Sequence, residues 1–225
     1  MSDVESTSFP SSVPSSSGSE IARVVRKRPK PGERRVQILQ ALATMLEQPG
    51  AERITTAALA ARLEVSEAAL YRHFASKAQM FEGLIEFIEQ TVFSLVNQIT
   101  ERERAAEAPN ASAGTQQAGS VVAMLMQFAE KNPGMTRVMV GDALVFENER
   151  LQQRMNQFFD KIEATLKQSL RGVAELGGSA TPSADTQVRA SVLTAFVVGR
   201  LQRFARSGFR RLPSEHLEAS LALML

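Results

Sequence analysis

The sequence predicts an all-α fold of about nine helices, and two features of its patterning support this. Apolar residues recur at three- and four-residue intervals through most of the chain, which places them on one face of a helix. Ser or Thr stands directly before several of these stripes, and Pro or Gly follows them, as expected at helix starts and stops. No segment shows a convincing β-strand alternation, so we expect helices throughout.

Four helices are expected in the front part of the chain, over residues 33–48, 55–63, 66–74 and 76–101. Pro49 ends the first of them. Thr55 and Ser66 are hydroxyl N-caps for the second and third. The third is short because Ser76 starts the fourth, where Gln79 three residues on completes a capping box.

Five further helices are expected over residues 121–130, from 133, and over 151–170, 186–209 and 217–225. Pro133 suits the first turn of a helix, where its missing N–H has no partner to lose. The composition loosens over residues 105–119 and 172–184, and we expect loops there.

The composition limits the class of protein. The 225 residues, 44% of them hydrophobic, are enough for one large domain or two small ones. No apolar run of membrane-spanning length is present, and the Ser/Pro-rich start does not resemble a secretory signal. The absence of cysteine excludes disulfides and thiolate chemistry, and the two histidines, His73 and His216, lie far apart. We therefore expect a cytoplasmic protein that is not an enzyme and needs no cofactor, metal, membrane or small-molecule ligand.

Charge divides the chain into three parts. Residues 1–32 form a Ser/Pro-rich tail, expected to be disordered, and most of a basic arm, RVVRKRPKPGERR, which spans residues 23–35. Residues 20–80 carry eleven Lys/Arg against six Asp/Glu, whereas residues 81–225 carry fifteen against sixteen. A basic front segment suggests a polyanionic partner, and the arm is either a solvated linker or a segment that lies along phosphates. We place a first domain at residues 33–78 and a second at 79–225.

The second and third helices form a candidate helix-turn-helix, in which the third would enter the major groove of DNA. Leu59, Leu70 and Phe74 would hold the pair against the first helix. The opposite face of the third helix carries small and polar side chains, which suit a groove. The alternative is that the two helices form an ordinary helical hairpin inside a bundle. The expected DNA-binding residues are Thr55, Thr56, Ser66, Glu67, Ala68, Ala69, Tyr71, Arg72, His73 and Lys77.

The segment ITTAALAARLEVSEAALYRHFASKAQMF resembles the DNA-binding domain of TetR-type transcription regulators. A narrower resemblance, over about residues 36–209, is to the nucleoid occlusion factors within that family. It is carried by MFEGLIEFIEQ and by EKNPGMTRVMVGDALVFENERLQQRMNQFFDKIEA. This resemblance implies a nucleoid-associated dimer that binds palindromic double-stranded DNA and the cell-division protein FtsZ, and that blocks division-ring assembly. The N-terminal tail and the lengths of the two expected loops depart from that family.

The resemblance places FtsZ contacts around the fourth and fifth helices. The expected residues there are Phe87, Met124, Gln127, Lys131 and Asn132. The alternative function is a TetR-type repressor gated by a small molecule, whose pocket Met124, Met126, Met135, Met139 and Phe146 could line. Those side chains could equally fill the core.

The helix over residues 186–209 is too apolar for a solvated helix. We expect it to form a homodimer interface by packing against its twin, a two-fold arrangement that matches a palindromic site. Burial within the monomer is the alternative. The expected interface residues are Val192, Ala195, Phe196, Gly199 and Arg203.

Overall fold

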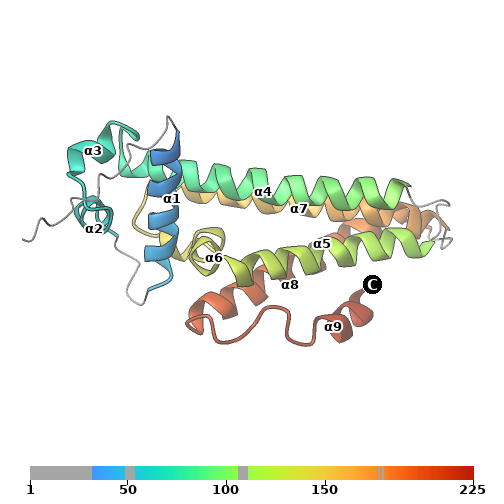
Figure 1. Ribbon diagram of the computed structural model, residues 1–225. Coiled ribbons are helices and arrows are strands. Elements are labelled where there is room, and N and C mark those ends of the chain that lie inside the picture. The colour runs from blue at the N-terminus through green and yellow to red at the C-terminus, as the bar shows by residue number, and fades with distance from the viewer. Residues whose placement is uncertain (1–31, 49–53, 106–110, 177, 179) are drawn as a thin grey trace, which may run out of the picture.

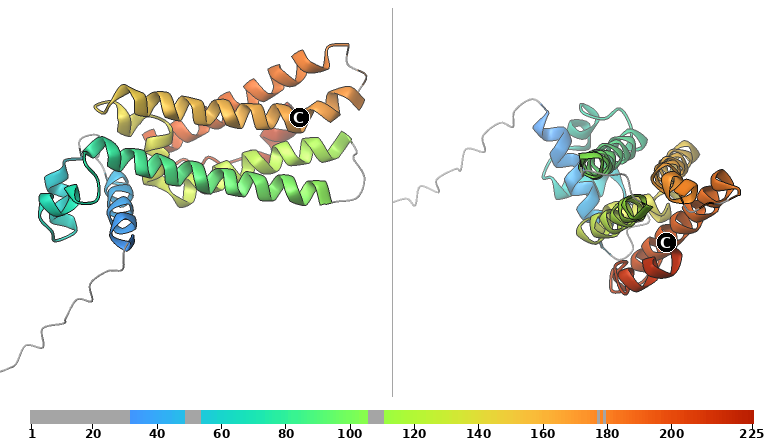
Figure 2. Two further views of the ribbon diagram at one scale, coloured as in Figure 1. Left: turned by 90° about the horizontal axis from the view of Figure 1, so that it is seen from above. Right: turned by 90° about the vertical axis from the view of Figure 1, so that its right-hand side faces the viewer.

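A computed structural model describes residues 32–48, 54–105, 111–176, 178 and 180–225 of the chain, and Figures 1 and 2 show its helices. The expected tail and most of the basic arm lie outside these residues. The helices are α1 (Glu33–Leu46), α2 (Thr56–Arg62), α3 (Glu67–Tyr71), α4 (Lys77–Ala105), α5 (Ala111–Lys131), α6 (Pro133–Met139), α7 (Glu149–Leu176), α8 (Pro182–Arg206) and α9 (Leu217–Met224), with a short 3₁₀ helix, η2 (Asp142–Leu144), before α7. No strand occurs in the described part of the chain, and the predicted all-α class is confirmed.

The helices form a small unit at one end and a long bundle behind it. In Figure 1, α1, α2 and α3 cluster at the left, and α4 leads from them along the whole body. The long helices α4, α5, α7 and α8 make up that body, which the right-hand view of Figure 2 shows nearly end-on. The helix α6 lies at the junction, between α1 and the bundle.

The predicted helix starts of the front unit are confirmed. The hydroxyl of Thr55 accepts a hydrogen bond from the backbone N–H of Ala58 at 3.1 Å, and Ser66 accepts one from Ala69 at 3.3 Å. Ser76 accepts from the N–H of Gln79 at 3.2 Å. The side chain of Gln79 reaches back to the N–H of Ala75 at 2.8 Å, as in a capping box.

One continuous apolar core joins the two units. Ile38, Leu42, Leu59, Leu70 and Phe74 are essentially fully buried in the front unit and belong to the same cluster as the core of the body. Burying a side chain of this size contributes about 1.5–3 kcal/mol, so the front unit cannot rotate freely on the body without losing much of this.

Helix α6 packs directly on α1. A Cβ atom at Gly134 would lie 1.9 Å from the carbonyl oxygen of Ala43, so only glycine allows this approach. Arg137 on the same helix donates a hydrogen bond to the carbonyl of Gln48 at 2.9 Å, and its guanidinium lies 5.0 Å from the ring centre of Phe209. The orientation of α1 therefore depends on α6.

The loop predicted over residues 105–119 is wrong at 111–119, because α5 begins at Ala111, and residues 106–110 lie outside the described residues. Gly114 explains the difference: a Cβ atom there would lie 2.3 Å from the carbonyl oxygen of Ser169 on α7. This glycine permits close helix packing and does not break the helix, since tertiary contacts offset its poor helix propensity. The loop predicted over residues 172–184 is also wrong at both ends, because α7 runs to Leu176 and α8 begins at Pro182.

The five side chains considered for a ligand pocket divide into two groups. Met126 and Met139 are buried in the core, and Met124 and Met135 pack against it. Phe146 is 60% exposed, so it neither fills the core nor lines an internal pocket. It follows the turn of η2, where the chain turns outward before α7.

Within the described residues, no helix is both long enough and apolar enough to cross a bilayer.

Candidate nucleic-acid interface

The turn between α2 and α3 has the geometry of a helix-turn-helix. Glu64 adopts a left-handed conformation, with φ at 53°. The N–H of Val65 then donates to the carbonyl of Ala60 at 3.0 Å. A left-handed residue reverses the chain within one position, which sets the short α3 across α2.

The structure brings several predicted DNA-binding residues onto one surface. Thr56 donates a hydrogen bond to the carboxylate of Glu67 at 2.6 Å, and the Tyr71 hydroxyl lies 3.4 Å from the same threonine oxygen. These contacts link α2 to α3. The sequence indicated each of the three residues separately and did not predict that they touch. The other predicted residues of the motif are also wholly or partly exposed: Thr55, Ser66, Ala68, Ala69, Arg72 and His73.

Arg35 supports the end of α3 and was not among the residues selected from the sequence. Its guanidinium donates to the carbonyl of His73 at 2.7 Å and lies 4.1 Å from the ring centre of Phe74. A guanidinium over an aromatic face is attracted by the ring quadrupole. Nothing in the basic run distinguished this arginine from its neighbours, because both its partners are distant in the sequence.

Lys77, the first residue of α4, forms an ion pair with a residue of the body. Its Nζ lies 2.5 Å from the carboxylate of Glu147, which precedes α7. The Glu147 side chain is only 8% exposed, whereas that of Lys77 is 32% exposed. Lys77, which is predicted to contact phosphate, therefore also forms an ion pair between the DNA-binding unit and the body.

The residues expected to contact FtsZ lie on α4, α5 and the start of α6. Phe87 is 46% exposed on α4. Met124 and Gln127 line a shallow hollow with Ile99 and Arg102, and Phe87 is not part of its lining. Lys131 is exposed, and the side chain of Asn132 donates to the carbonyl of Phe128 at 2.8 Å, so it also closes the end of α5.

One face of α8 is apolar and uncovered. Val188 and Val192 are 62% and 48% exposed, and Ala195 is exposed as well. A Cβ atom at Gly199 would meet nothing within 4 Å. Phe196 is half-buried beneath the guanidinium of Arg200. Burial of Val192 and Ala195 within one chain, the alternative considered for this helix, is therefore wrong.

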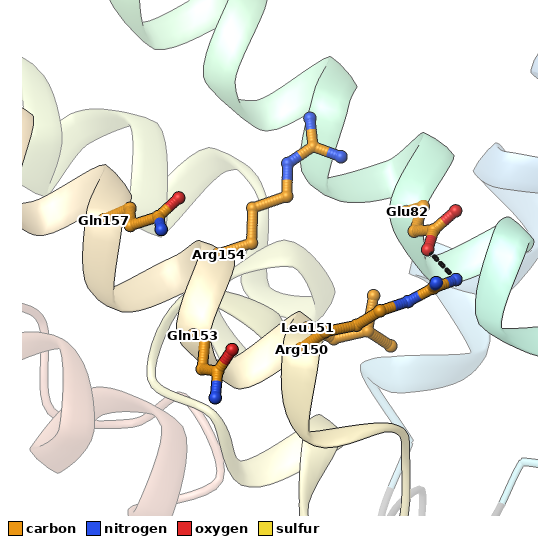
Figure 3. A pocket seen from close by; sticks show the side chains of 6 residues that line it. All are labelled: Glu82, Arg150, Leu151, Gln153, Arg154 and Gln157. Atoms are coloured by element: carbon orange, nitrogen blue, oxygen red, sulfur yellow. Dashed lines mark ion pairs between the residues drawn. The ribbon is translucent and has the colours of Figure 1, made fainter.

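Ion pairs line the contact between α4 and α7. Figure 3 shows a hollow between these helices in which Arg150 pairs with Glu82, while Arg154 extends toward α4. Arg154 donates to Glu89 at 2.6 Å, and this hydrogen bond, with the neighbouring carboxylates, raises the pKa of Arg154. Among the described residues, no group of three or more His, Asp or Glu could hold a metal ion.

A short exposed helix, held by Leu70 in the core that it shares with α1 and α2 and joined to a helical bundle, is the arrangement of a TetR-type helix-turn-helix protein. The comparisons agree with this class. Residues 38–84 match the bacterial regulatory proteins of the tetR family, and residues 116–225 match the SlmA-like form of the tetracyclin repressor-like C-terminal domain.

The most informative relatives are nucleoid occlusion factors. The chain is 49% identical over 197 residues to nucleoid occlusion factor SlmA of Aliivibrio fischeri strain MJ11, covering 87% of this chain and 96% of that protein. It is 47% identical over 191 residues to SlmA of Idiomarina loihiensis, covering 85% and 93%. The chain therefore belongs to the SlmA family of nucleoid occlusion factors, which are DNA-binding proteins and not enzymes.

Solved structures show the same fold at low sequence identity. The regulator FadR from Bacillus subtilis, determined with stearoyl-CoA, superposes with a TM-score of 0.65 at 14% identity and covers 84% of this chain and 96% of its own. PfmR from Thermus thermophilus, another TetR-family regulator, superposes with a TM-score of 0.64 at 21% identity and covers 84% and 97%. At such identities these matches establish the fold alone.

Proposed function

We propose that the protein is a homodimer that binds palindromic chromosomal sites through α3 and binds FtsZ through the outer surface of α4 and α5. FtsZ bound there would be kept from assembling a division ring over the chromosome. The observation that carries the DNA-binding part is the exposed surface of α2 and α3, on which Thr56, Glu67 and Tyr71 meet. Family membership supplies the occlusion role, and the sequence resemblance supplies FtsZ as the partner.

The chemistry of α3 suits a major groove. Ala68 and Ala69 have small side chains that let the helix approach base edges, and their methyl groups suit contact with thymine methyls. Tyr71 and His73 can donate hydrogen bonds to phosphate oxygens, which fix the register of the protein on DNA. Arg35 keeps the end of α3 in place for these contacts.

The uncovered face of α8 supports the dimer. An apolar stripe with a glycine at which nothing blocks close approach is typical of two helices in contact. A two-fold axis through this face would present two copies of α3 to the two half-sites of a palindrome. Val192, Ala195, Phe196, Gly199 and Arg203 are the residues we assign to this interface.

The FtsZ surface is proposed from the exposed positions of α4 and α5. An aromatic residue that is about half exposed is a suitable anchor for a partner, and Phe87 meets this description. Met124 and Gln127 line a separate hollow with Ile99, and the exposed Lys131 follows Gln127 by one turn of α5. Asn132 has a structural hydrogen bond as well, so its replacement would affect both the helix end and any partner.

Sedimentation of FtsZ polymers with the protein, in the presence and absence of its DNA, tests the proposal. We expect the protein to reduce the pelleted FtsZ, and Phe87→Ala and Lys131→Ala to abolish this while keeping DNA affinity. Leu223→Ala is the matched control, because Leu223 is a 90% exposed apolar residue that belongs to α9 and not to α4 or α5. Unchanged FtsZ pelleting with and without DNA would contradict the occlusion mechanism.

Selection of bound sites from genomic DNA separates this function from the alternative, a repressor gated by a small molecule. Sites scattered over the chromosome and sparse near the replication terminus support occlusion. One or two promoter sites would instead indicate a dedicated repressor. The burial of Met126 and Met139 in the core favours occlusion, because these side chains fill space that a ligand would need.

A further inference from the structure

The ion pair between Lys77 and Glu147 joins the DNA-binding unit to the body at the end nearest α3. Lys77 begins α4, directly after the segment that follows α3, and Glu147 lies between η2 and α7. Their charged atoms are 2.5 Å apart, a short distance even for a charge-assisted hydrogen bond. This contact therefore ties the start of α4, close to the helix-turn-helix, to the body.

Glu147 is held more firmly than Lys77. Its side chain is 8% exposed, and its backbone N–H donates to the carbonyl of Leu144 at 3.0 Å, within the turn of η2. The Lys77 ammonium also lies 5.8 Å from the ring centre of Phe81, a buried residue one turn along α4. The carboxylate is thus the fixed member of the pair, and it determines where the ammonium lies.

A phosphate is not expected to draw Lys77 away from this carboxylate. If the ammonium left, Glu147 would remain as a buried charge without its cation, which is strongly unfavourable. Separation is also unnecessary, because an ammonium has three N–H donors and one suffices for Glu147. The 32% exposure of the Lys77 side chain leaves room for a second acceptor.

We propose that Glu147 is a positioning residue for DNA binding. It holds the Lys77 ammonium where the first turn of α4 meets the DNA backbone, and it ties that turn to the body. This inference rests on the proposed phosphate contact of Lys77. It extends the DNA-binding machinery to a residue of the body that does not itself touch DNA.

Glu147→Gln tests this role, with affinity for a palindromic duplex measured by fluorescence anisotropy over a range of salt concentrations. Removing a carboxylate near DNA would, by charge alone, strengthen binding. We expect binding to weaken by about tenfold instead, because the ammonium is no longer held in place. The slope of log Kd against log salt should stay close to that of the wild type, since the lysine charge remains.

Lys77→Gln gives a different result if the lysine contacts phosphate. Affinity should fall by about tenfold, and the salt slope should decrease by about 1.8, since a dimer loses one phosphate contact in each half-site. Glu82→Gln is the matched control, because Glu82 pairs with Arg150 farther along the same helix contact. Its affinity should stay within about twofold of the wild type.

The exchanged double variant K77E/E147K separates positioning from folding. It restores an ion pair, so its thermal midpoint should exceed that of Glu147→Gln, while DNA binding stays weak because a carboxylate now faces the phosphates. Glu147→Asp retains the charge but shortens the side chain, and it should also lose affinity while remaining folded.

Three results would overturn the proposal: unchanged or stronger DNA binding by folded Glu147→Gln, a reduced salt slope in that variant, or restored DNA binding in the exchanged variant. A different result tests the proposed function. If Lys77→Gln leaves both affinity and slope unchanged, the phosphate contact itself is absent.

Discussion

Replacing Gly134 by alanine should separate the DNA-binding unit from the body. The added methyl group would lie 1.9 Å from the carbonyl oxygen of Ala43 and 3.3 Å from Cγ of Glu47. The first of these atoms belongs to the backbone of α1, so no side-chain rotation can make room. Helices α1 and α6 would have to move apart by at least about 1 Å to reach an acceptable contact.

The expected loss of stability follows from how little the contact between α1 and α6 can move. Overpacking a tight contact costs about 1–3 kcal/mol, and we expect about 3 kcal/mol because the obstructing atom is backbone. For a chain of this size, that corresponds to a fall in Tm of about 6–12 °C. Movement of α1 also displaces α3, so affinity for the palindrome should decrease even at temperatures where the variant is folded.

Thermal unfolding followed by circular dichroism, with anisotropy titration of DNA at about 20 °C below the variant's transition, measures both effects. Gly172→Ala is the control, because a Cβ atom there meets nothing within 4 Å and the residue lies within α7. It should be neutral or stabilising by up to about 1 kcal/mol. A Gly134→Ala protein as stable as the wild type would refute the close packing of α6 on α1.

Three other variants test separate parts of the molecule. Tyr71→Ala should weaken DNA binding by about tenfold, with the dimer intact by light scattering; unchanged affinity at moderate salt would argue against docking through this face. Gly199→Leu should shift the dimer toward monomer in sedimentation while each chain remains helical, because the added side chain has open space within one chain. A dimer as tight as the wild type would move the interface elsewhere. Glu64→Gly should be more stable to denaturant than Glu64→Ala by about 1 kcal/mol, because φ at 53° favours glycine. Equal stabilities would mean that the turn relaxes.

The DNA-binding motif could be predicted from the sequence because its signals are local. The caps at Thr55, Ser66 and Ser76 involve hydrogen bonds between residues three apart, and the structure contains each of them. Helical spacing likewise indicated that Leu70 and Phe74 are buried and that Tyr71 is exposed. Such short-range patterns need no knowledge of what packs against them.

Predictions that depended on packing were less successful. Composition alone made residues 105–119 a loop, yet Gly114 is a contact point between α5 and α7. Phe146 was a candidate for a pocket, yet it is exposed. A glycine or an aromatic residue has several uses, and only its neighbours decide among them.

The contacts that orient the DNA-binding unit follow from the tertiary structure alone. Arg137 and its partner Gln48 are 89 residues apart, and Lys77 meets Glu147 only because α4 and α7 are neighbours in the bundle. The sequence was sufficient for the class of protein and for the exposed face of α3 that we propose meets DNA, since both depend on periodicity and caps. The position of that face relative to the body depends on contacts between residues far apart in the sequence, which local sequence patterns do not specify.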